Sequence, residues 1–153
     1  MQIAKSFGAK VTGVCSTEHL GMVLSNGADH VIDYTQHDFT QSKGHYDLIF
    51  EFVAKCCFPE CKGALNTNGL YVTTEFSPGL ALRGLWNSFT SSKKFIPLSP
   101  KKPNKSNQVF MRKLLEDGKV EPVIDRYYKL YEVPDALQYL SKGHAQGKVV
   151  IKV

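Results

Sequence analysis

The sequence has no long hydrophobic run and no recognisable targeting segment. No stretch of the 153 residues approaches the roughly 18 consecutive apolar residues that a membrane-spanning helix needs. The opening residues, MQIAKSFGAK, show neither the apolar core nor the small-residue cleavage site of a secretory signal peptide. We therefore expect a cytoplasmic protein with no membrane partner.

The sequence also lacks the residue patterns of hydrolytic and metal-dependent catalysis. Its five histidines are scattered, with no G-x-S-x-G element and no Ser-His-Asp order. Three of the four cysteines lie together in CCFPEC (56–61), and no second Cys or His cluster follows at a matching distance. We predict no metal site and no catalytic side chain. We interpret these cysteines as small hydrophobic residues on or near one helix rather than as disulfide partners.

The charge is mildly basic. The chain carries 19 Lys and Arg residues against 14 Asp and Glu residues, a net charge of +5, and much of the excess lies between Lys93 and Lys113. No nucleic-acid-binding motif accompanies these lysines, which favours a solvated basic face and no nucleic-acid partner. The same charge would suit an anionic cofactor.

Short β-branched or apolar runs alternate with segments of helical periodicity along the chain. We predict strands over 10–15, 30–34, 46–54, 70–76, 93–99, 120–130 and 148–153. We predict helices over 16–27, 58–69, 106–119 and 132–143, and the opening residues read as the tail of another. Strands that alternate with helices in this way indicate an α/β protein with a mostly parallel, twisted sheet.

Four segments share the order and approximate spacing of a known family: AKSFGAKVTGVCST, GADHVIDYT, GKVEPVIDRYYKL and ALQYLSKGHAQGKVVIKV. Of these, GADHVIDY and GHAQGKVVI are the most specific. With them the sequence resembles the medium-chain dehydrogenase/reductase superfamily, and within it the zinc-free quinone oxidoreductase branch. The resemblance covers nearly the whole chain, from Gln2 to Val153.

The resemblance implies a Rossmann-like, doubly wound, mostly parallel sheet that lacks the family's first strand. The glycine-rich turn and the GroES-like domain of the family are also missing from this sequence. Residues 1–125 would form a partial NAD(P)-binding Rossmann domain. Residues 126–153 would be the helix and strand that return to the GroES-like domain in the family.

The function implied is that of the cofactor-binding portion of an NADPH-dependent quinone oxidoreductase-like or zinc-type alcohol dehydrogenase-like enzyme. The complete enzyme would transfer hydride to a quinone or enone, as a homodimer, and the fragment alone would be inactive. The alternative is a non-enzymatic truncated remnant that acts as a folded dimerisation or interaction module. A nucleotide-binding regulator is a third possibility.

The choice of NADPH rests on how the predicted strand 10–15 ends. An acid at this point of a dinucleotide fold grips the ribose and selects NAD, whereas this strand ends in Cys15, Ser16 and Thr17. The resemblance places Ser16 at the 2′-phosphate. The alternative is that Ser16 is a helix N-cap, and Glu18 would repel a phosphate if it pointed inward.

The remaining cofactor contacts come from the resemblance and from the rule that ligands lie beyond the carboxyl ends of parallel strands. They are Tyr34, Val53, Thr74, Phe76, His144, Ala145 and Gln146. On the sequence alone, Tyr34 also fits a structural strand-end tyrosine. His144 also fits a helix C-cap, where an imidazolium interacts favourably with the helix dipole.

Absence of the family's first strand has a structural consequence. In the usual Rossmann order that strand lies between the second and the fourth, which here would be the predicted strands 10–15 and 46–54. Their edges would lack a partner, and apolar edges of this kind associate. The two strands could pair directly, a second chain could fill the gap, or the C-terminal segment could do so.

Overall fold

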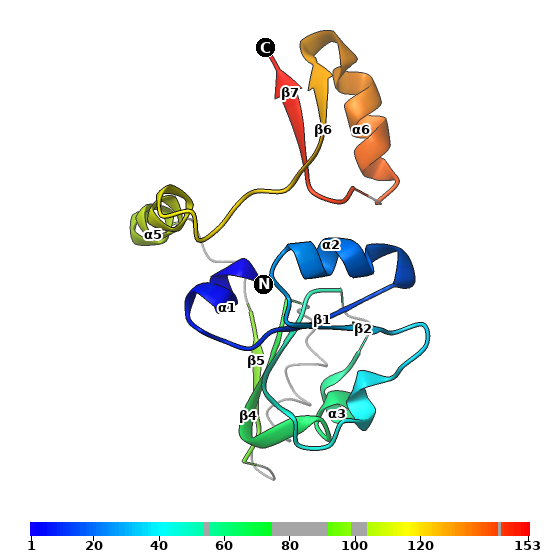
Figure 1. The fold of residues 1–153 in the computed structure, drawn as a ribbon, viewed down its shortest axis with the longest axis vertical. Coiled ribbons are helices and arrows are strands. Elements are labelled where there is room, and N and C mark those ends of the chain that lie inside the picture. Colours follow the sequence, from blue (N-terminus) through cyan, green and yellow to red (C-terminus); the bar gives the residue numbers. More distant parts are fainter. Residues whose placement is uncertain (54–55, 75–91, 99–103, 144) are drawn as a thin grey trace. The chain divides into compact units, whose positions relative to one another are not determined.

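Helices and strands alternate along the chain in a computed structural model that describes residues 1–53, 56–74, 92–98, 104–143 and 145–153 (Figure 1). The strands are β1 (Thr12–Cys15), β2 (His30–Asp33), β3 (Tyr46–Glu51), β4 (Leu65–Thr73), β5 (Lys94–Pro97), β6 (Ile124–Lys129) and β7 (Lys148–Lys152). The α-helices are α1 (Gln2–Ser6), α2 (Leu20–Ser25), α3 (Phe58–Cys61), α5 (Lys105–Glu116) and α6 (Val133–Ser141). The 3₁₀ turns within these ranges are η1 (Thr17–His19), η2 (Phe39–Gln41) and η3 (Leu130–Glu132).

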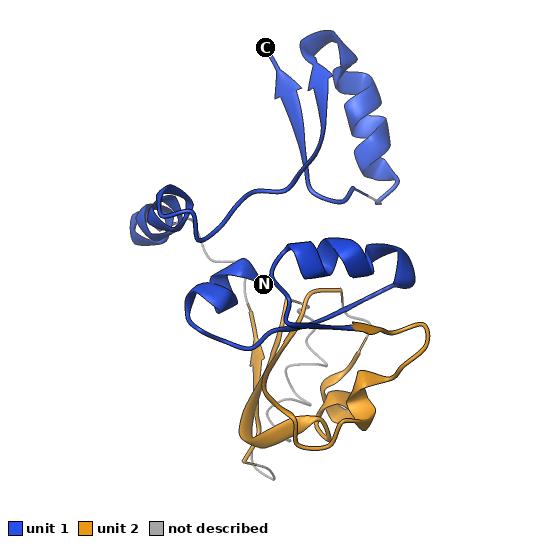
Figure 2. Ribbon diagram, in the orientation of Figure 1, with its two compact units in different colours: residues 1–31, 104–153 blue, residues 32–103 orange. Residues whose placement is uncertain are grey.

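The chain forms two compact units (Figure 2). The first unit joins residues 1–31 to residues 104–153, and the second contains residues 32–103. The domain boundary that the sequence suggests between residues 125 and 126 stays a prediction.

The second unit is built on a parallel sheet in the order β3-β4-β5. Its register aligns Ile49 with Tyr71 and Tyr71 with Phe95, so these three side chains share one face. That face packs on Phe58 and Cys61 of α3, and the Phe58 ring lies 5.5 Å from the rings of both Tyr71 and Phe95. This aromatic cluster is the core of the unit.

In the first unit, β6 and β7 form a parallel pair joined through η3 and α6. Pro134 lies in the first turn of α6, where its missing N–H is tolerated, and Gly143 follows the helix with a φ of 72°. The longer helix α5 is capped by Asn104, whose side chain accepts a hydrogen bond from the Ser106 N–H at 3.0 Å. Gly118 ends that helix with a φ of 65°.

The strands β3, β4 and β5 pair in parallel, and β6 pairs in parallel with β7 in a separate sheet. This parallel pairing confirms the predicted α/β class. The strands β1 and β2 form a two-stranded sheet of their own. The three outcomes expected for the edges of the predicted strands 10–15 and 46–54 stay predictions.

The predicted helix over 58–69 is wrong beyond its first turn. The helix α3 ends at Cys61, and β4 begins already at Leu65. Asn68 has a φ of 65°, a left-handed conformation that an α-helix cannot contain. The register between β3 and β4 shifts between Tyr46 and Leu48, so the 66–69 segment is an irregular stretch within the strand.

The cysteine cluster also differs from the expectation. Cys56 and Cys61 form a disulfide, whereas the sequence suggests small unpaired hydrophobic side chains. The single turn of α3 brings the two residues together, with their Cα atoms 6.8 Å apart. Cys61 is fully buried in the aromatic cluster, which agrees with its interpretation as a core residue, and Cys57 is an exposed free thiol.

Candidate functional site

Two of the predicted cofactor contacts meet in the second unit, at the carboxyl ends of β3 and β4. The Thr74 N–H donates to the Glu51 carbonyl at 3.2 Å, and the Thr74 hydroxyl donates to the Phe52 carbonyl at 3.2 Å. The Val53 N–H donates to the Glu51 carboxylate at 3.1 Å. Val53 and Thr74 therefore lie at the ends of adjacent parallel strands, and the Val53 residue is 70% exposed.

In the first unit, Ser16 stands at the end of β1. It has extended backbone angles and occupies the N-cap position of η1, and its carbonyl accepts the His19 N–H at 2.9 Å. Its side chain makes no capping hydrogen bond to that turn. The backbone thus takes the N-cap position that the alternative interpretation expects, while the hydroxyl is not used for capping.

The structure brings Gln146 close to the same turn. The Gln146 Nε2 atom lies 3.5 Å from Nδ1 of His19, and His19 follows Ser16 by three residues. His19 is not among the predicted contacts. The sequence signal that could have pointed to it is its position as a basic residue shortly after the strand β1. Gln146 and the Ser16–His19 turn therefore belong to one local group in the first unit.

The other predicted contacts are distributed as follows. Tyr34 directly follows β2 in the second unit and is about half exposed. Ala145 precedes Gln146 in the first unit. Phe76 and His144 lie outside the residues that the structure describes.

The segment that carries Gln146 is held by Asp125. The Asp125 side chain is 9% exposed, and its Oδ2 atom accepts hydrogen bonds from the Tyr139 hydroxyl at 2.7 Å and from the Gln146 N–H at 2.8 Å. Its Oδ1 atom accepts from Nε of Arg126 at 3.1 Å. The Arg126 guanidinium in turn lies 3.6 Å from the centroid of the Tyr139 ring, a cation–π distance.

These hydrogen bonds shift the pKa values of Asp125 and Tyr139 in opposite directions. The hydrogen bond that the Tyr139 hydroxyl donates lowers the pKa of Asp125 below its ordinary 3.8, and the bond from the Gln146 N–H lowers it further by a smaller amount. The same bond to Asp125, reinforced by burial, raises the pKa of Tyr139 above its ordinary 10.0. Asp125 is therefore a carboxylate and Tyr139 a neutral donor across the physiological range.

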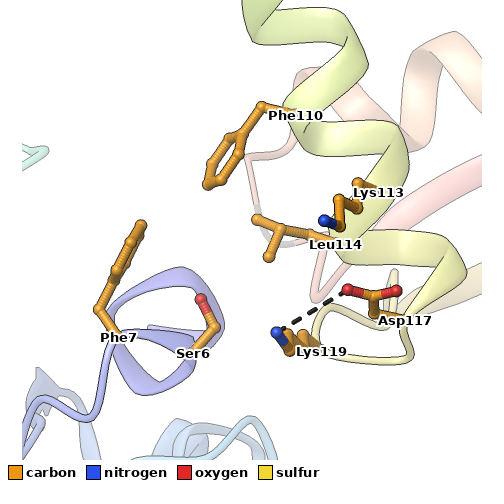
Figure 3. A pocket seen from close by; sticks show the side chains of 7 residues that line it. All are labelled: Ser6, Phe7, Phe110, Lys113, Leu114, Asp117 and Lys119. Carbon is orange, nitrogen blue, oxygen red and sulfur yellow. Dashed lines mark ion pairs between the residues drawn. The ribbon is translucent and has the colours of Figure 1, made fainter.

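A separate pocket of about 210 Å³ lies between α1 and the end of α5 (Figure 3). The rings of Phe7 and Phe110 stack across it with centroids 6.2 Å apart, and a 3.8 Å ion pair joins Lys119 to Asp117. Of the predicted contacts that the structure describes, none lines this pocket.

Across the described ranges, no three His, Cys, Asp or Glu side chains are grouped as a metal site would need. The donors near the end of β1 are of a different kind, namely the hydroxyl of Ser16, the ring of His19 and the amide of Gln146. Neutral or cationic donors of this type fit a phosphate group, with Glu18 as the one carboxylate in the turn. No helix in the described part is long and apolar enough to cross a membrane.

Parallel strands joined by helices, with polar groups gathered where the strands end, define a protein of the Rossmann-type α/β class. The model of one family, described as zinc-binding dehydrogenase, matches residues 26–151. The chain therefore belongs to the zinc-binding dehydrogenase family. This confirms the resemblance to the medium-chain dehydrogenase/reductase superfamily that the sequence motifs indicate.

Two similar proteins come from Arabidopsis thaliana. A chloroplast envelope quinone oxidoreductase homolog is 30% identical over 99% of this chain and 47% of its own length. An NADPH-dependent alkenal/one oxidoreductase of the chloroplast is 33% identical over 99% of this chain and 36% of its own length. The chain thus spans less than half the length of these curated relatives.

The structure of a quinone oxidoreductase from Coxiella burnetii superposes on the chain with a TM-score of 0.77 and 25% identity. The superposition covers 99% of this chain and 47% of that one. An NAD-dependent alcohol dehydrogenase gives a TM-score of 0.78 at 22% identity, which supports the fold alone. The match to these structures along almost the whole chain confirms the predicted Rossmann-type fold.

Proposed function

We propose that the chain is the cofactor-binding portion of an NADPH-dependent oxidoreductase that, in its complete form, transfers hydride to a quinone or an enone. The names of two relatives give these substrate classes, a quinone oxidoreductase homolog and an alkenal/one oxidoreductase. Because the chain spans less than half of either relative, the activity belongs to the complete enzyme. The 153 residues alone are expected to be inactive.

The observation that carries the proposal is that Ser16, and not an acid, directly follows β1, with Glu18 two residues further along in η1. An acid at this point would hold the ribose of NAD, whereas Ser16 leaves room for a 2′-phosphate. Gln146 and His19, 3.5 Å apart, add an amide and a ring nitrogen to the same turn. A relative described as NADPH-dependent supports the same choice.

NADPH supplies the hydride when it is bound, so the residues of this chain would bind and orient it and exclude water. The proposed contacts in the first unit are Ser16, Ala145 and Gln146, with His144. Those in the second unit are Tyr34, Val53 and Thr74, with Phe76.

Calorimetric titration of the purified chain with NADPH and with NADH tests this proposal. We expect micromolar binding of NADPH and binding of NADH weaker by about tenfold, which corresponds to roughly 1.4 kcal/mol. Absence of heat with both nucleotides would contradict retained cofactor binding. Equal affinity for the two would contradict the choice of NADPH.

One observation favours the alternative of a folded interaction module. On β3 the side chains of Leu48 and Phe50 are 51% and 42% exposed, and Phe52 stacks on Phe50 with ring centroids 4.3 Å apart. Parallel sheets are ordinarily covered on both faces, and exposed apolar patches mark interaction surfaces. A chain that gives no heat with NADPH but is a dimer by light scattering would support the module.

Three further parts of the proposal concern the complete protein. We propose that the complete protein is a homodimer in the cytoplasm and that residues 126–153 return to a GroES-like domain. Tyr127, Tyr131 and Leu137 are exposed in this chain, and such a domain would cover apolar side chains of this kind. Light scattering and cell fractionation of the complete protein would test the dimer and the location.

A further inference from the structure

Two hydrogen bonds fasten the segment before β7 to β6. The Gln146 N–H donates to the Asp125 carboxylate at 2.8 Å, and the Lys148 N–H donates to the Val123 carbonyl at 2.7 Å. Between them, a Cβ atom built on Gly147 would lie 2.5 Å from the Val123 carbonyl oxygen. The segment therefore runs directly against the start of β6, at a distance that suits glycine.

Asp125 is itself held in one orientation. Its Oδ2 atom accepts both the Tyr139 hydroxyl and the Gln146 N–H, so one oxygen joins α6 to the segment. The Arg126 Nε atom occupies the other oxygen, and the Arg126 guanidinium stacks on the Tyr139 ring. A carboxylate that is 9% exposed and fixed from two sides is a rigid acceptor.

We propose that Asp125 is a positioning residue for the cofactor and acts through Gln146, an inference that rests on the proposed NADPH function. The carboxylate fixes the Gln146 backbone, and the backbone directs the Gln146 side chain to the turn that carries His19, 3.5 Å away. Asp125 need not touch the cofactor. It orients a residue that is proposed to do so.

The structure indicates that this role is separable from folding. Without the carboxylate, the Gln146 N–H loses its acceptor, but the Lys148 N–H keeps its bond to Val123 and β7 keeps its pairing with β6. We therefore expect the fold to persist while the Gln146 segment loosens. Loosening of a contact residue weakens binding because the segment must then be ordered when the ligand binds.

The test compares Asp125→Ala with Asp125→Asn in the full 153-residue chain. Alanine removes the acceptor. The asparagine amide oxygen can take the place of Oδ2 and accept both the Tyr139 hydroxyl and the Gln146 N–H, while the amide NH2 in place of Oδ1 cannot accept the Arg126 Nε–H. Asp117→Asn is the matched control, since Asp117 pairs with Lys119 at the end of α5 and has no contact with the Gln146 segment in the described structure.

Two quantities are measured at a temperature where circular dichroism shows every variant to be folded. The first is the NADPH dissociation constant by calorimetry. We expect it to rise by about tenfold in Asp125→Ala and by about threefold or less in Asp125→Asn, and to stay unchanged in Asp117→Asn. The second is the amide proton resonance of Gln146, which should move upfield in Asp125→Ala because donation to a carboxylate ends.

A double-variant cycle tests the route through Gln146. If Asp125 acts through that side chain, Asp125→Ala should add little to the loss already caused by Gln146→Ala. Full additivity of the two losses would overturn the inference. Should Asp125→Ala fail to fold, Tyr139→Phe frees the carboxylate on one side and should weaken NADPH binding by about threefold.

Unchanged NADPH affinity in Asp125→Ala together with a shifted Gln146 resonance would show that Asp125 is structural alone, and would leave the proposed function intact. Absence of NADPH binding by the unsubstituted chain would overturn the proposed function, and this inference with it. The two failures are therefore distinguishable.

Discussion

The Lys5 ammonium lies 2.6 Å from the Asp29 carboxylate and joins α1 to the turn that precedes β2. The other oxygen of Asp29 accepts the Val11 N–H at 2.7 Å, so this carboxylate also supports the start of β1. Both contacts are within the first unit. They connect residues 24 and 18 positions apart, and they depend on the charge of Asp29.

Acid should weaken the first unit through this carboxylate. The Lys5 hydrogen bond, followed by the Val11 N–H, lowers the pKa of Asp29 below its ordinary 3.8. A lowered pKa in the folded state means that the contribution is present above about pH 3.8 and is lost as the pH falls through the lower folded value. Asp29→Asn should lower Tm by a few degrees at pH 7 and make Tm less sensitive to pH below 4. Thermal denaturation of both proteins between pH 7 and 2.5 checks this. Equal acid sensitivity would contradict it.

The aromatic core of the second unit should be sensitive to truncation. Phe58 is 3% exposed and contacts Tyr71 and Phe95, so Phe58→Ala should destabilise the protein by about 3–5 kcal/mol. Leu137→Ala is the control, because that side chain is 62% exposed and its loss should change the free energy of unfolding by less than about 0.5 kcal/mol. Urea unfolding measures both. Similar losses for the two variants would argue against this core.

Gly147 should not tolerate a side chain. A Cβ atom there would lie 2.5 Å from the Val123 carbonyl oxygen, so Gly147→Ala must displace the segment from β6 and should destabilise the chain by about 1–3 kcal/mol. Gly21→Ala makes the same chemical change within α2, where the added Cβ would meet no described atom outside its own helical backbone within 4 Å, and should stabilise by about 0.5–1 kcal/mol. Opposite signs in thermal unfolding are the expected result, and a neutral Gly147→Ala would contradict the close approach.

The three clustered cysteines should differ in reactivity. Cys57 is an exposed free thiol, whereas Cys56 and Cys61 are joined in a disulfide. Alkylation of the native chain without reductant should leave the tryptic peptide CCFPECK with one alkyl group and an intact disulfide. Prior treatment with dithiothreitol in denaturant should give three alkyl groups on the same peptide. Mass spectrometry distinguishes these states, and three groups without reductant would contradict the disulfide.

A carboxylate at the end of β1 should change the nucleotide preference. Ser16→Asp keeps a residue type suited to the N-cap position of η1 and places a negative charge where the 2′-phosphate is proposed. We expect NADPH to bind about tenfold more weakly, with NADH binding unchanged or tighter. The ratio of the two dissociation constants is the readout, because damage to the fold would weaken both nucleotides alike. Ser92→Asp, in the second unit, controls for the added charge.

Much of the fold could be predicted because its signals are local. The β-branched run that ends at Cys15, the apolar run of β3 and the amphipathic pattern of α5 each depend on neighbouring residues. The helix predicted over 58–69 is wrong because strand pairing between distant residues determines the structure of this segment. Leu65 is 1% exposed and pairs with Tyr46, so these residues extend β4 instead of α3.

The roles of the proposed cofactor contacts stay predictions. The sequence puts Val53 and Thr74 at the carboxyl ends of two successive strands, and the structure has them at the ends of the adjacent strands β3 and β4. The Asp125 network gave no sequence signal, because Asp125 is 14 residues from Tyr139 and 21 residues from Gln146. His19 and Gln146 are 127 positions apart, and their proximity follows from the folded chain.

Three features could be predicted from the sequence: the alternation of strands and helices, the family, and a residue other than an acid at the end of β1. They depend respectively on periodicity, motif order and residue identity, which are properties of the linear sequence. Three other features became visible in the folded chain: the β3-β4-β5 strand order, the Cys56–Cys61 disulfide and the hydrogen bond from the Gln146 N–H to Asp125. Pairing, register and burial are relations between distant residues, and they exist once the chain is folded.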